Sequence, residues 1–450
     1  MITCLKNIDT VVSCDASDTV YRNVDLWIDE NRICGIGSFV GKADAVIDGS
    51  DLIVYPGLIN VHHHLYQYFS RNLAKVQNME LFDWLKTLYG VWKRLNEDTV
   101  FLSSSSGMGE LMRFGCTTCF DHHYVFPNDC GDLLGEQFEA AKQLGIRMHA
   151  SRGSMDLSEK DGGLPPDSVV QDVDTILKDS SDAINRYHDP CTYSMRQIVI
   201  APCSPFSAST VLYRESAVLA RMSGVRLHTH LCETKDEEAY TLHAFGKRPF
   251  HYLEDLGWTG EDVFYAHGIH FNDEELDRIA DTHTKIAHCP CSNMKLSSGV
   301  MRLPDMIRRN ICVGLAVDGS ASNDGSNLMD EMRTAYLLHR LTWGDLAPSG
   351  YEILKLATVG SAKVLGRKDI GSLAVGKAAD LFAIKRSSTD LLCANDDPKS
   401  MFGSVGYHRP CDLVMVNGQI TVRDGRLTRI DEESLFKRSQ AELKRFLSDL

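Results

Sequence analysis

The sequence predicts an α/β protein built on a closed, parallel (β/α)8 barrel of the TIM type, with a small β-sandwich domain made from both chain ends. The first observation behind this prediction is a series of short apolar, β-branched runs bounded by turn residues. Eight such runs occur, at residues 52–61, 115–121, 145–150, 197–202, 225–230, 263–267, 285–288 and 312–318. Each gap between runs has room for a helix, and the stretch from Ser207 to Ser223 is an amphipathic example.

The second observation is that polar residues recur where these predicted strands end. In a parallel barrel the active site lies at the carboxyl ends of the strands. The ends carry, in chain order, His64, His122, Arg152, Cys203, His230, His267, His288 and Asp318. Their repetition at one structural position predicts a single functional site at that face of the barrel.

The barrel does not use the whole chain. Residues 1–55 and 370–430 both resemble short strands joined by turns, and Asn417-Gly418 is a strong hairpin signal. We therefore expect residues 1–55 and 370–430 to form the small β-sandwich domain. Residues 56–369 are expected to form the catalytic barrel, and residues 431–450 a C-terminal helix.

Composition limits the possible partners. The 450 residues are 43% hydrophobic, enough for a sizeable core, and carry a formal charge of −14, which argues against nucleic acid or an anionic membrane as a partner. No apolar run approaches the roughly 18 residues that span a bilayer. The start, Met1 to Lys6, lacks the pattern of a secretion signal, and the 14 cysteines are scattered. We expect a cytoplasmic protein with reduced thiols that assembles as a homo-oligomer.

The pair His62 and His64 is the most informative local pattern. Alternate side chains of an extended segment point the same way, so these two imidazoles should converge while His63 points away. Two imidazoles aimed at one point at a strand end are typical of a transition-metal site. His228 and His230 repeat the spacing, but we interpret His228 as a core residue or as a support for a ligand.

These segments resemble the amidohydrolase superfamily, in its cytosine- and guanine-deaminase branch. The resemblance covers essentially the whole chain, in order. It is carried by residues 56–64 (PGLINVHHH), 230–234 (HLCET), 267–268 (HG), 288–296 (HCPCSNMKL), 318–323 (DGSASN) and 371–381 (GSLAVGKAADL).

The resemblance implies that His62, His64, His230 and Asp318 bind one divalent metal ion. Three imidazoles and a carboxylate suit zinc, with iron as the alternative. Two-metal relatives use a bridging lysine at the end of the fourth strand. Residues 202–204 at that position contain no lysine, which favours a single ion.

The same resemblance implies the catalytic residues. A divalent ion lowers the pKa of a coordinated water from about 15.7 toward 7. Glu233 is expected to carry a proton from that water to a ring nitrogen, and His267 to hold the attacking oxygen. Asp318 is expected to pass the second proton to the departing amine.

Substrate contacts are implied for Gln67, Cys203, Trp84, Glu233 and His267. The Gln67 amide offers both a donor and an acceptor, which suits a lactam edge. Cys203 stands where relatives often have histidine, which indicates a different substrate edge. Trp84 is the best aromatic candidate for a flat-ring pocket, although it could equally fill the core.

The implied activity is hydrolytic deamination of an amino-substituted oxo-heterocycle. Within this branch the pattern resembles the group that deaminates 8-oxoguanine to urate and ammonia, with isocytosine as a similar ring. One alternative is an ethylaminohydrolase acting on hydroxy-s-triazines such as hydroxyatrazine, since the electrophilic carbon is alike. An alternative of another class is a non-catalytic barrel scaffold, which predicts broken metal ligands.

Overall fold

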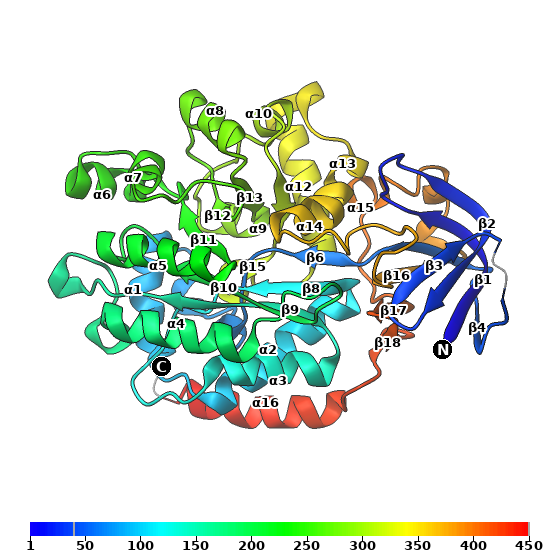
Figure 1. Ribbon diagram of the computed structural model, residues 1–450, viewed down its shortest axis with the longest axis horizontal. Coiled ribbons are helices and arrows are strands. Elements are labelled where there is room, and N and C mark those ends of the chain that lie inside the picture. The colour runs from blue at the N-terminus through cyan, green and yellow to red at the C-terminus, as the bar shows by residue number, and fades with distance from the viewer. Residues whose placement is uncertain (39–40, 449–450) are drawn as a thin grey trace.

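The computed structural model describes residues 1–38 and 41–448, which form two large sheets and one two-stranded sheet (Figure 1). The eight barrel strands are all parallel to their neighbours, in the order β14-β13-β12-β11-β10-β9-β8-β6. They are β6 (Leu58–Asn60), β8 (Cys116–Asp121), β9 (Arg147–Ser154), β10 (Arg196–Pro202), β11 (Arg226–Leu231), β12 (Val263–His267), β13 (Lys285–His288) and β14 (Val313–Leu315). The predicted (β/α)8 barrel is confirmed.

The two end strands of this sheet approach each other and nearly close it. The Val61 amide donates to the Leu315 carbonyl at 3.4 Å, and the Val317 amide donates to Asn60 Oδ1 at 2.9 Å. Just beyond, β7 (His63–His64) pairs in parallel with β15 (Asp318–Gly319). This closure brings the first histidine pair beside Asp318, across more than 250 residues of chain.

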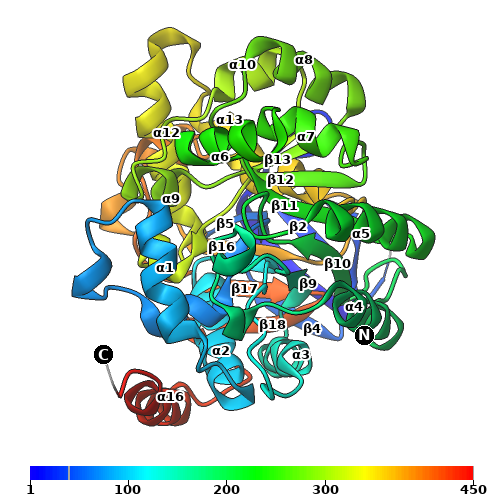
Figure 2. The ribbon, with the colours of Figure 1, turned by 90° about the vertical axis from the view of Figure 1, so that its left-hand side faces the viewer.

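Helices surround the barrel strands (Figure 2). They are α1 (Leu81–Trp92), α2 (Glu97–Arg113), α3 (Leu133–Leu144), α4 (Val173–Tyr187), α5 (Thr210–Ser223), α6 (Lys235–Phe245), α7 (Pro249–Asp255), α8 (Asp273–Thr282), α9 (Pro290–Lys295), α10 (Leu303–Arg308), α11 (Ser320–Asn323), α12 (Leu328–Trp343), α13 (Gly350–Lys355) and α14 (Ser361–Val364). The predicted helix at 207–223 is α5. It begins after Ser209, whose side chain accepts from the Leu212 amide, and ends at Gly224 in the left-handed conformation.

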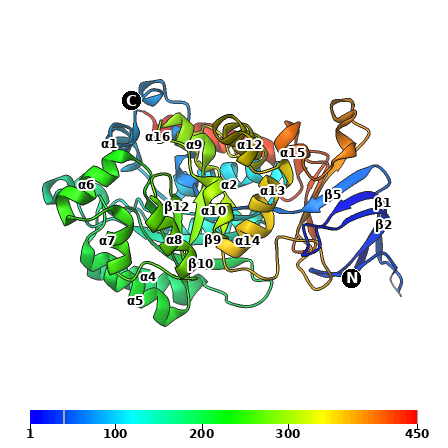
Figure 3. The same cartoon turned by 90° about the horizontal axis from the view of Figure 1, so that it is seen from above.

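The second sheet has nine strands drawn from both chain ends and lies at one side of the barrel (Figure 3). The strands are β1 (Ile2–Val12), β2 (Val20–Asp29), β3 (Arg32–Ile36), β4 (Ala45–Asp48), β5 (Leu52–Pro56), β16 (Leu381–Lys385), β17 (Leu413–Val416), β18 (Gln419–Arg423) and β19 (Arg426–Leu427). Asn417 and Gly418 join β17 to β18 with positive φ at both residues, as a type I′ hairpin requires. The short helix α15 (Met401–Ser404) lies between β16 and β17.

After this sheet the chain returns to the barrel as α16 (Glu432–Phe446), which runs alongside α2 (Figure 1). The Asp431 side chain caps the helix by accepting from the Glu433 and Ser434 amides. Among residues 1–38 and 41–448, no helix is long and apolar enough to cross a membrane.

Three predicted strands differ from the structure by more than one residue at an end. The run 52–61 is two strands, because the chain passes from one sheet to the other at Gly57, where a Cβ would overlap the Thr117 side chain. The run 145–150 begins late, because Gly145 ends α3 at φ +82°, and it continues to Ser154. The run 312–318 is interrupted after Leu315, and Asp318 has φ +64°, outside the strand region.

Candidate functional site

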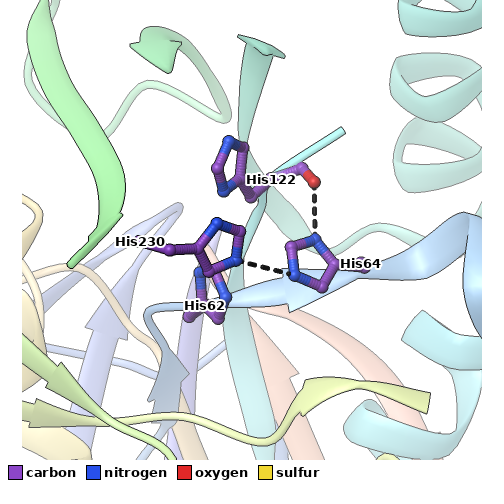
Figure 4. A group of neighbouring side chains, drawn as sticks. All are labelled: His62, His64, His122 and His230. Carbon is purple, nitrogen blue, oxygen red and sulfur yellow. Dashed lines mark hydrogen bonds between the residues drawn. The ribbon is translucent and has the colours of Figure 1, made fainter. Parts of the chain in front are cut away.

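Four buried histidines meet at the carboxyl ends of the barrel strands (Figure 4). His62 and His64 follow β6, His122 follows β8, and His230 lies near the end of β11. One ring nitrogen from each lies within 4.8 Å of the others. His62 also belongs to a second group of the same kind, with His267 and Asp318. Side chains far apart in sequence therefore converge on one point.

Hydrogen bonds determine which nitrogen of His64 and His230 faces this point. His64 Nδ1 lies 2.7 Å from the carbonyl oxygen of His122, and His230 Nδ1 lies 2.7 Å from that of Cys203. A carbonyl oxygen only accepts, so both Nδ1 atoms carry hydrogen and each neutral ring has its lone pair at Nε2. The two Nε2 atoms are 3.2 Å apart.

A proton between these two nitrogens is disfavoured. Burial, together with the neighbouring imidazoles, lowers the pKa of His230 well below 6.5. Two lone pairs held this close in a buried site repel each other unless a cation lies between them. The arrangement therefore fits a metal ion.

His62 is oriented by a relay through His228. His228 Nδ1 lies 2.9 Å from the Phe264 carbonyl oxygen and so carries hydrogen, which leaves Nε2 as an acceptor. That Nε2 lies 3.0 Å from His62 Nδ1, which must then donate. The lone pair of His62 is left on Nε2, a buried atom with no hydrogen-bond partner among the described residues. His63 points away, with Nε2 3.0 Å from Ser326 Oγ.

Asp318 supplies the negative charge of the group. Its Oδ1 lies 3.3 Å from both His62 Nε2 and His64 Nε2. With the ring hydrogens on Nδ1, this oxygen and the two Nε2 atoms are three acceptors facing one another, an arrangement that a cation would satisfy. Three imidazole nitrogens and a carboxylate facing one point match the donor set of zinc, so the residues fit the metal.

Glu233 and His267 lie beside the point where the histidine nitrogens and Asp318 converge. His267 Nε2 is 3.5 Å from Glu233 Oε2 and 3.9 Å from Asp318 Oδ2. His267 Nδ1 lies 2.8 Å from Asn293 Oδ1; with the proton on that nitrogen, the lone pair of His267 also faces inward. Burial and the Asp318 charge raise the pKa of Glu233 to about 8. Glu233 is thus a carboxyl group that can hold a proton at neutral pH.

Three residues of this site have strained backbone conformations. His267 and Asp318 have φ of +72° and +64°, and Cys232, between His230 and Glu233, has φ +53°. Residues other than glycine rarely adopt this conformation, and such strain clusters at functional sites.

A small cavity, of about 30 Å³, opens onto this cluster. The three predicted substrate contacts from other segments, Gln67, Trp84 and Cys203, all line it, together with Glu233 and His267. Neither polar atom of the Gln67 side chain makes a hydrogen bond, nor does Trp84 Nε1, within the described chain. Buried polar groups are normally satisfied, so the amide and the indole are available to a ligand.

Two residues from the row of predicted strand ends turn away from the cavity. Arg152 stacks on Phe126 and bonds Gln171 at 2.6 Å and Asp179 at 3.2 Å. His288 lies 3.0 Å from His339, ring nitrogen to ring nitrogen. The recurrence of polar residues at strand ends therefore overstated how many of them share one site.

Sequence reasoning missed several lining residues. Tyr124, Phe206 and Ser322 contribute to the cavity wall, as do Leu81 and Leu296. Only Tyr124 had a usable signal, since it lies two residues past His122 at a strand end. His122 was placed at a strand end but given no role, yet its ring stacks on His230 with centroids 4.8 Å apart, and its Nδ1 has no hydrogen bond among the described residues.

Comparisons with known proteins agree with this site. A model described as the amidohydrolase family matches residues 53–421. The 8-oxoguanine deaminase of Pseudomonas aeruginosa is 45% identical over 394 residues, which cover 88% of this chain and 87% of that protein. The hydroxydechloroatrazine ethylaminohydrolase of Pseudomonas sp. (strain ADP) is 37% identical over 454 residues, covering 97% and 94%.

Solved structures agree as well. The zinc complex of atrazine chlorohydrolase from Arthrobacter aurescens superposes with a TM-score of 0.94 at 31% identity, covering 98% of this chain and 100% of that one. With a family model spanning most of its length and relatives above 30% identity along nearly all of it, the chain belongs to the amidohydrolase family.

Proposed function

We propose that this protein is a zinc-dependent hydrolytic deaminase of an amino-substituted oxo-heterocycle, with 8-oxoguanine as the leading substrate and isocytosine as a similar ring. The observation that carries the proposal is the convergence of three imidazole Nε2 atoms and the Asp318 carboxylate beside the protonatable Glu233, in one cavity. The relative that is 45% identical and named for 8-oxoguanine supports the choice of ring.

In this proposal His62, His64, His230 and Asp318 hold the ion. Bound there, zinc would supply Lewis-acid activation of water for attack at a ring carbon. The overall reaction replaces a ring C–NH2 by C=O, with one water consumed and one ammonia released.

Glu233 performs the first proton transfer. Its carboxyl group, held neutral by burial, donates a proton to the ring nitrogen beside the amino-bearing carbon. Protonation makes that carbon electrophilic. His267 Nε2, oriented by the contact of Nδ1 with Asn293, accepts a hydrogen bond from the attacking water. Glu233, now a carboxylate, regains a proton from the attacking water. Asp318 receives the second proton of that water and delivers it to the amine, so that ammonia leaves rather than an amide ion.

Side chains of the cavity wall recognise the substrate ring. The unpaired amide of Gln67 offers one donor and one acceptor to a lactam edge. Burial raises the pKa of the Cys203 thiol to about 12, so the part of the lining that Cys203 forms is small and uncharged at neutral pH. The Trp84 indole supplies a flat surface and a free N–H donor.

A second candidate is removal of ethylamine from a hydroxy-s-triazine, favoured by the 37% identical ethylaminohydrolase. The scaffold alternative predicts broken ligands, whereas His62, His64, His230, Glu233, His267 and Asp318 are all present and close together. The assay is release of amine from 8-oxoguanine, isocytosine, guanine and hydroxyatrazine by the zinc-loaded protein. Ammonia from 8-oxoguanine supports the first candidate and ethylamine from hydroxyatrazine the second. No turnover of any ring, with zinc bound, would overturn both.

A further inference from the structure

A second cavity, of about 530 Å³, lies at the opposite end of the barrel, where the strands begin. Arg226 is the first residue of β11 and Lys285 the first of β13, and both line it. His230 lies four residues beyond Arg226 on the same strand, which corresponds to about 13 Å at roughly 3.3 Å per residue. This cavity is therefore separate from the ion site and the substrate cavity.

We propose that this second cavity binds an oxyanion of the phosphate class, either free or as the phosphoryl group of a small metabolite. The proposal is independent of the reaction proposed above.

The first support is an excess of positive charge. Four cationic side chains line the cavity and have no carboxylate oxygen within 4.0 Å of their charged nitrogens among residues 1–38 and 41–448. They are Arg226, Lys285, Lys363 and Lys368. Two acidic residues also line the cavity. Asp262 is paired with Arg221 at 3.0 Å, so Glu261 is left as the acidic residue that could balance these cations. In a chain with a formal charge of −14, this local excess is unusual.

The second support is the way the two deeper cations are held. The Arg226 guanidinium and the Lys285 ammonium both donate to one backbone acceptor, the Glu261 carbonyl oxygen. One neutral oxygen does not neutralise two charges. Arg226 Nε is buried and has no hydrogen-bond partner in the described chain. At Gly366 a Cβ would overlap the guanidinium, so this glycine makes room for Arg226 where it lies.

The electrostatics of Lys285 agree with this geometry. Burial, followed by repulsion from Arg226, lowers its pKa to about 8. An anion placed between the two groups would reverse the repulsion and supply the missing acceptors. A guanidinium with free donors beside ammonium groups is the combination that recognises phosphate oxygens. The cavity has more room than one phosphate needs, and Lys363 and Lys368 lie exposed at its edge.

The test is isothermal titration calorimetry of the zinc-loaded protein with two probes, inorganic phosphate and ribose 5-phosphate, at ionic strength held constant with sodium chloride. We expect saturable binding of one equivalent. The double variant Lys285→Gln/Lys363→Gln should raise Kd at least tenfold. The control Lys178→Gln, an exposed lysine on α4 outside the cavity, should leave Kd unchanged.

Each outcome decides the proposal. Equal affinity for the two probes identifies free phosphate as the ligand, and at least tenfold tighter ribose 5-phosphate identifies a phosphorylated metabolite. Absence of saturable binding overturns the site. An unchanged Kd in the double variant also overturns the site. In that case phosphate binds elsewhere, for example at the zinc, where removing these lysines does not change its affinity. The single variant Lys285→Gln serves if the double variant does not fold.

Discussion

His228 Nε2 lies 3.0 Å from His62 Nδ1, and this contact directs the lone pair of His62 toward the ion site. His228 is itself held by the Phe264 carbonyl, so the tautomer of His62 is set two steps away, on β12. Groups that orient a metal-binding imidazole in this way contribute to affinity without touching the metal.

Changing His228 to Phe should therefore weaken zinc binding by about tenfold to a hundredfold. The substitution removes the acceptor for His62 Nδ1–H, so that the ring loses its preferred tautomer and orientation. Competition with a chromophoric chelator measures the affinity directly. His243→Phe, on the exposed face of α6, is the matched control, and equal affinities for both variants would contradict the relay.

Changing Glu233 to Gln should leave one zinc per chain and lower kcat by roughly 10²- to 10⁴-fold. Glutamine keeps the shape of the side chain but cannot deliver a proton to the ring nitrogen. Metal analysis and amine release are measured on the same sample. Wild-type turnover in a zinc-loaded variant would remove Glu233 as the proton donor.

Changing Gln67 to Ala should raise KM by about tenfold or more, while the zinc content stays the same. The wild-type amide has no hydrogen-bond partner in the described residues. Its deletion therefore removes hydrogen bonds to the substrate but changes the stability of the apoprotein little. Steady-state kinetics with 8-oxoguanine test this, with the exposed Gln440→Ala as control. Kinetics identical to the wild type would mean that another group reads the ring.

Changing Asp369 to Asn should destabilise the fold by about 1 kcal/mol at neutral pH, after allowance for solvent screening. Burial alone would raise the pKa of this carboxyl, but hydrogen bonds with Arg367 and the attraction of its charge lower it to about 2. A lowered folded pKa contributes stability that is present above the unfolded value of 3.8 and is lost as the pH falls through about 2.

Urea unfolding of wild type and variant between pH 2 and about pH 5 measures this dependence. The difference in the free energy of unfolding between wild type and variant should shrink as the pH falls from about 5 toward 2. A difference that stays constant over this range would show that Asp369 contributes through packing rather than charge.

Much of the architecture was predictable because local patterns encode it. Strand-length apolar runs locate the eight barrel strands, and the i, i+2 spacing of His62 and His64 is enough to place both imidazoles on one side of the chain. The positive φ at Asn417 and Gly418 was predictable too, since these residue types favour a type I′ turn.

Strand boundaries were less predictable. Gly57 separates β5 from β6 inside one continuous apolar run, and only the packing of Thr117 against it reveals the break. The interruption after Leu315 likewise depends on barrel closure, which places Asp318 opposite His63.

Local sequence patterns establish which residue types are available for metal and proton chemistry, and at which strand ends they lie. Which of these residues meet depends on the folded chain, because their convergence requires barrel closure between β6 and β14 and hydrogen bonds from remote carbonyls. Arg152 and His288 stand at strand ends like the others, yet Asp179 and His339 engage them elsewhere. The tautomer of His62, the unpaired amide of Gln67 and the shared carbonyl of Glu261 are all consequences of contacts between distant segments, which no local pattern encodes.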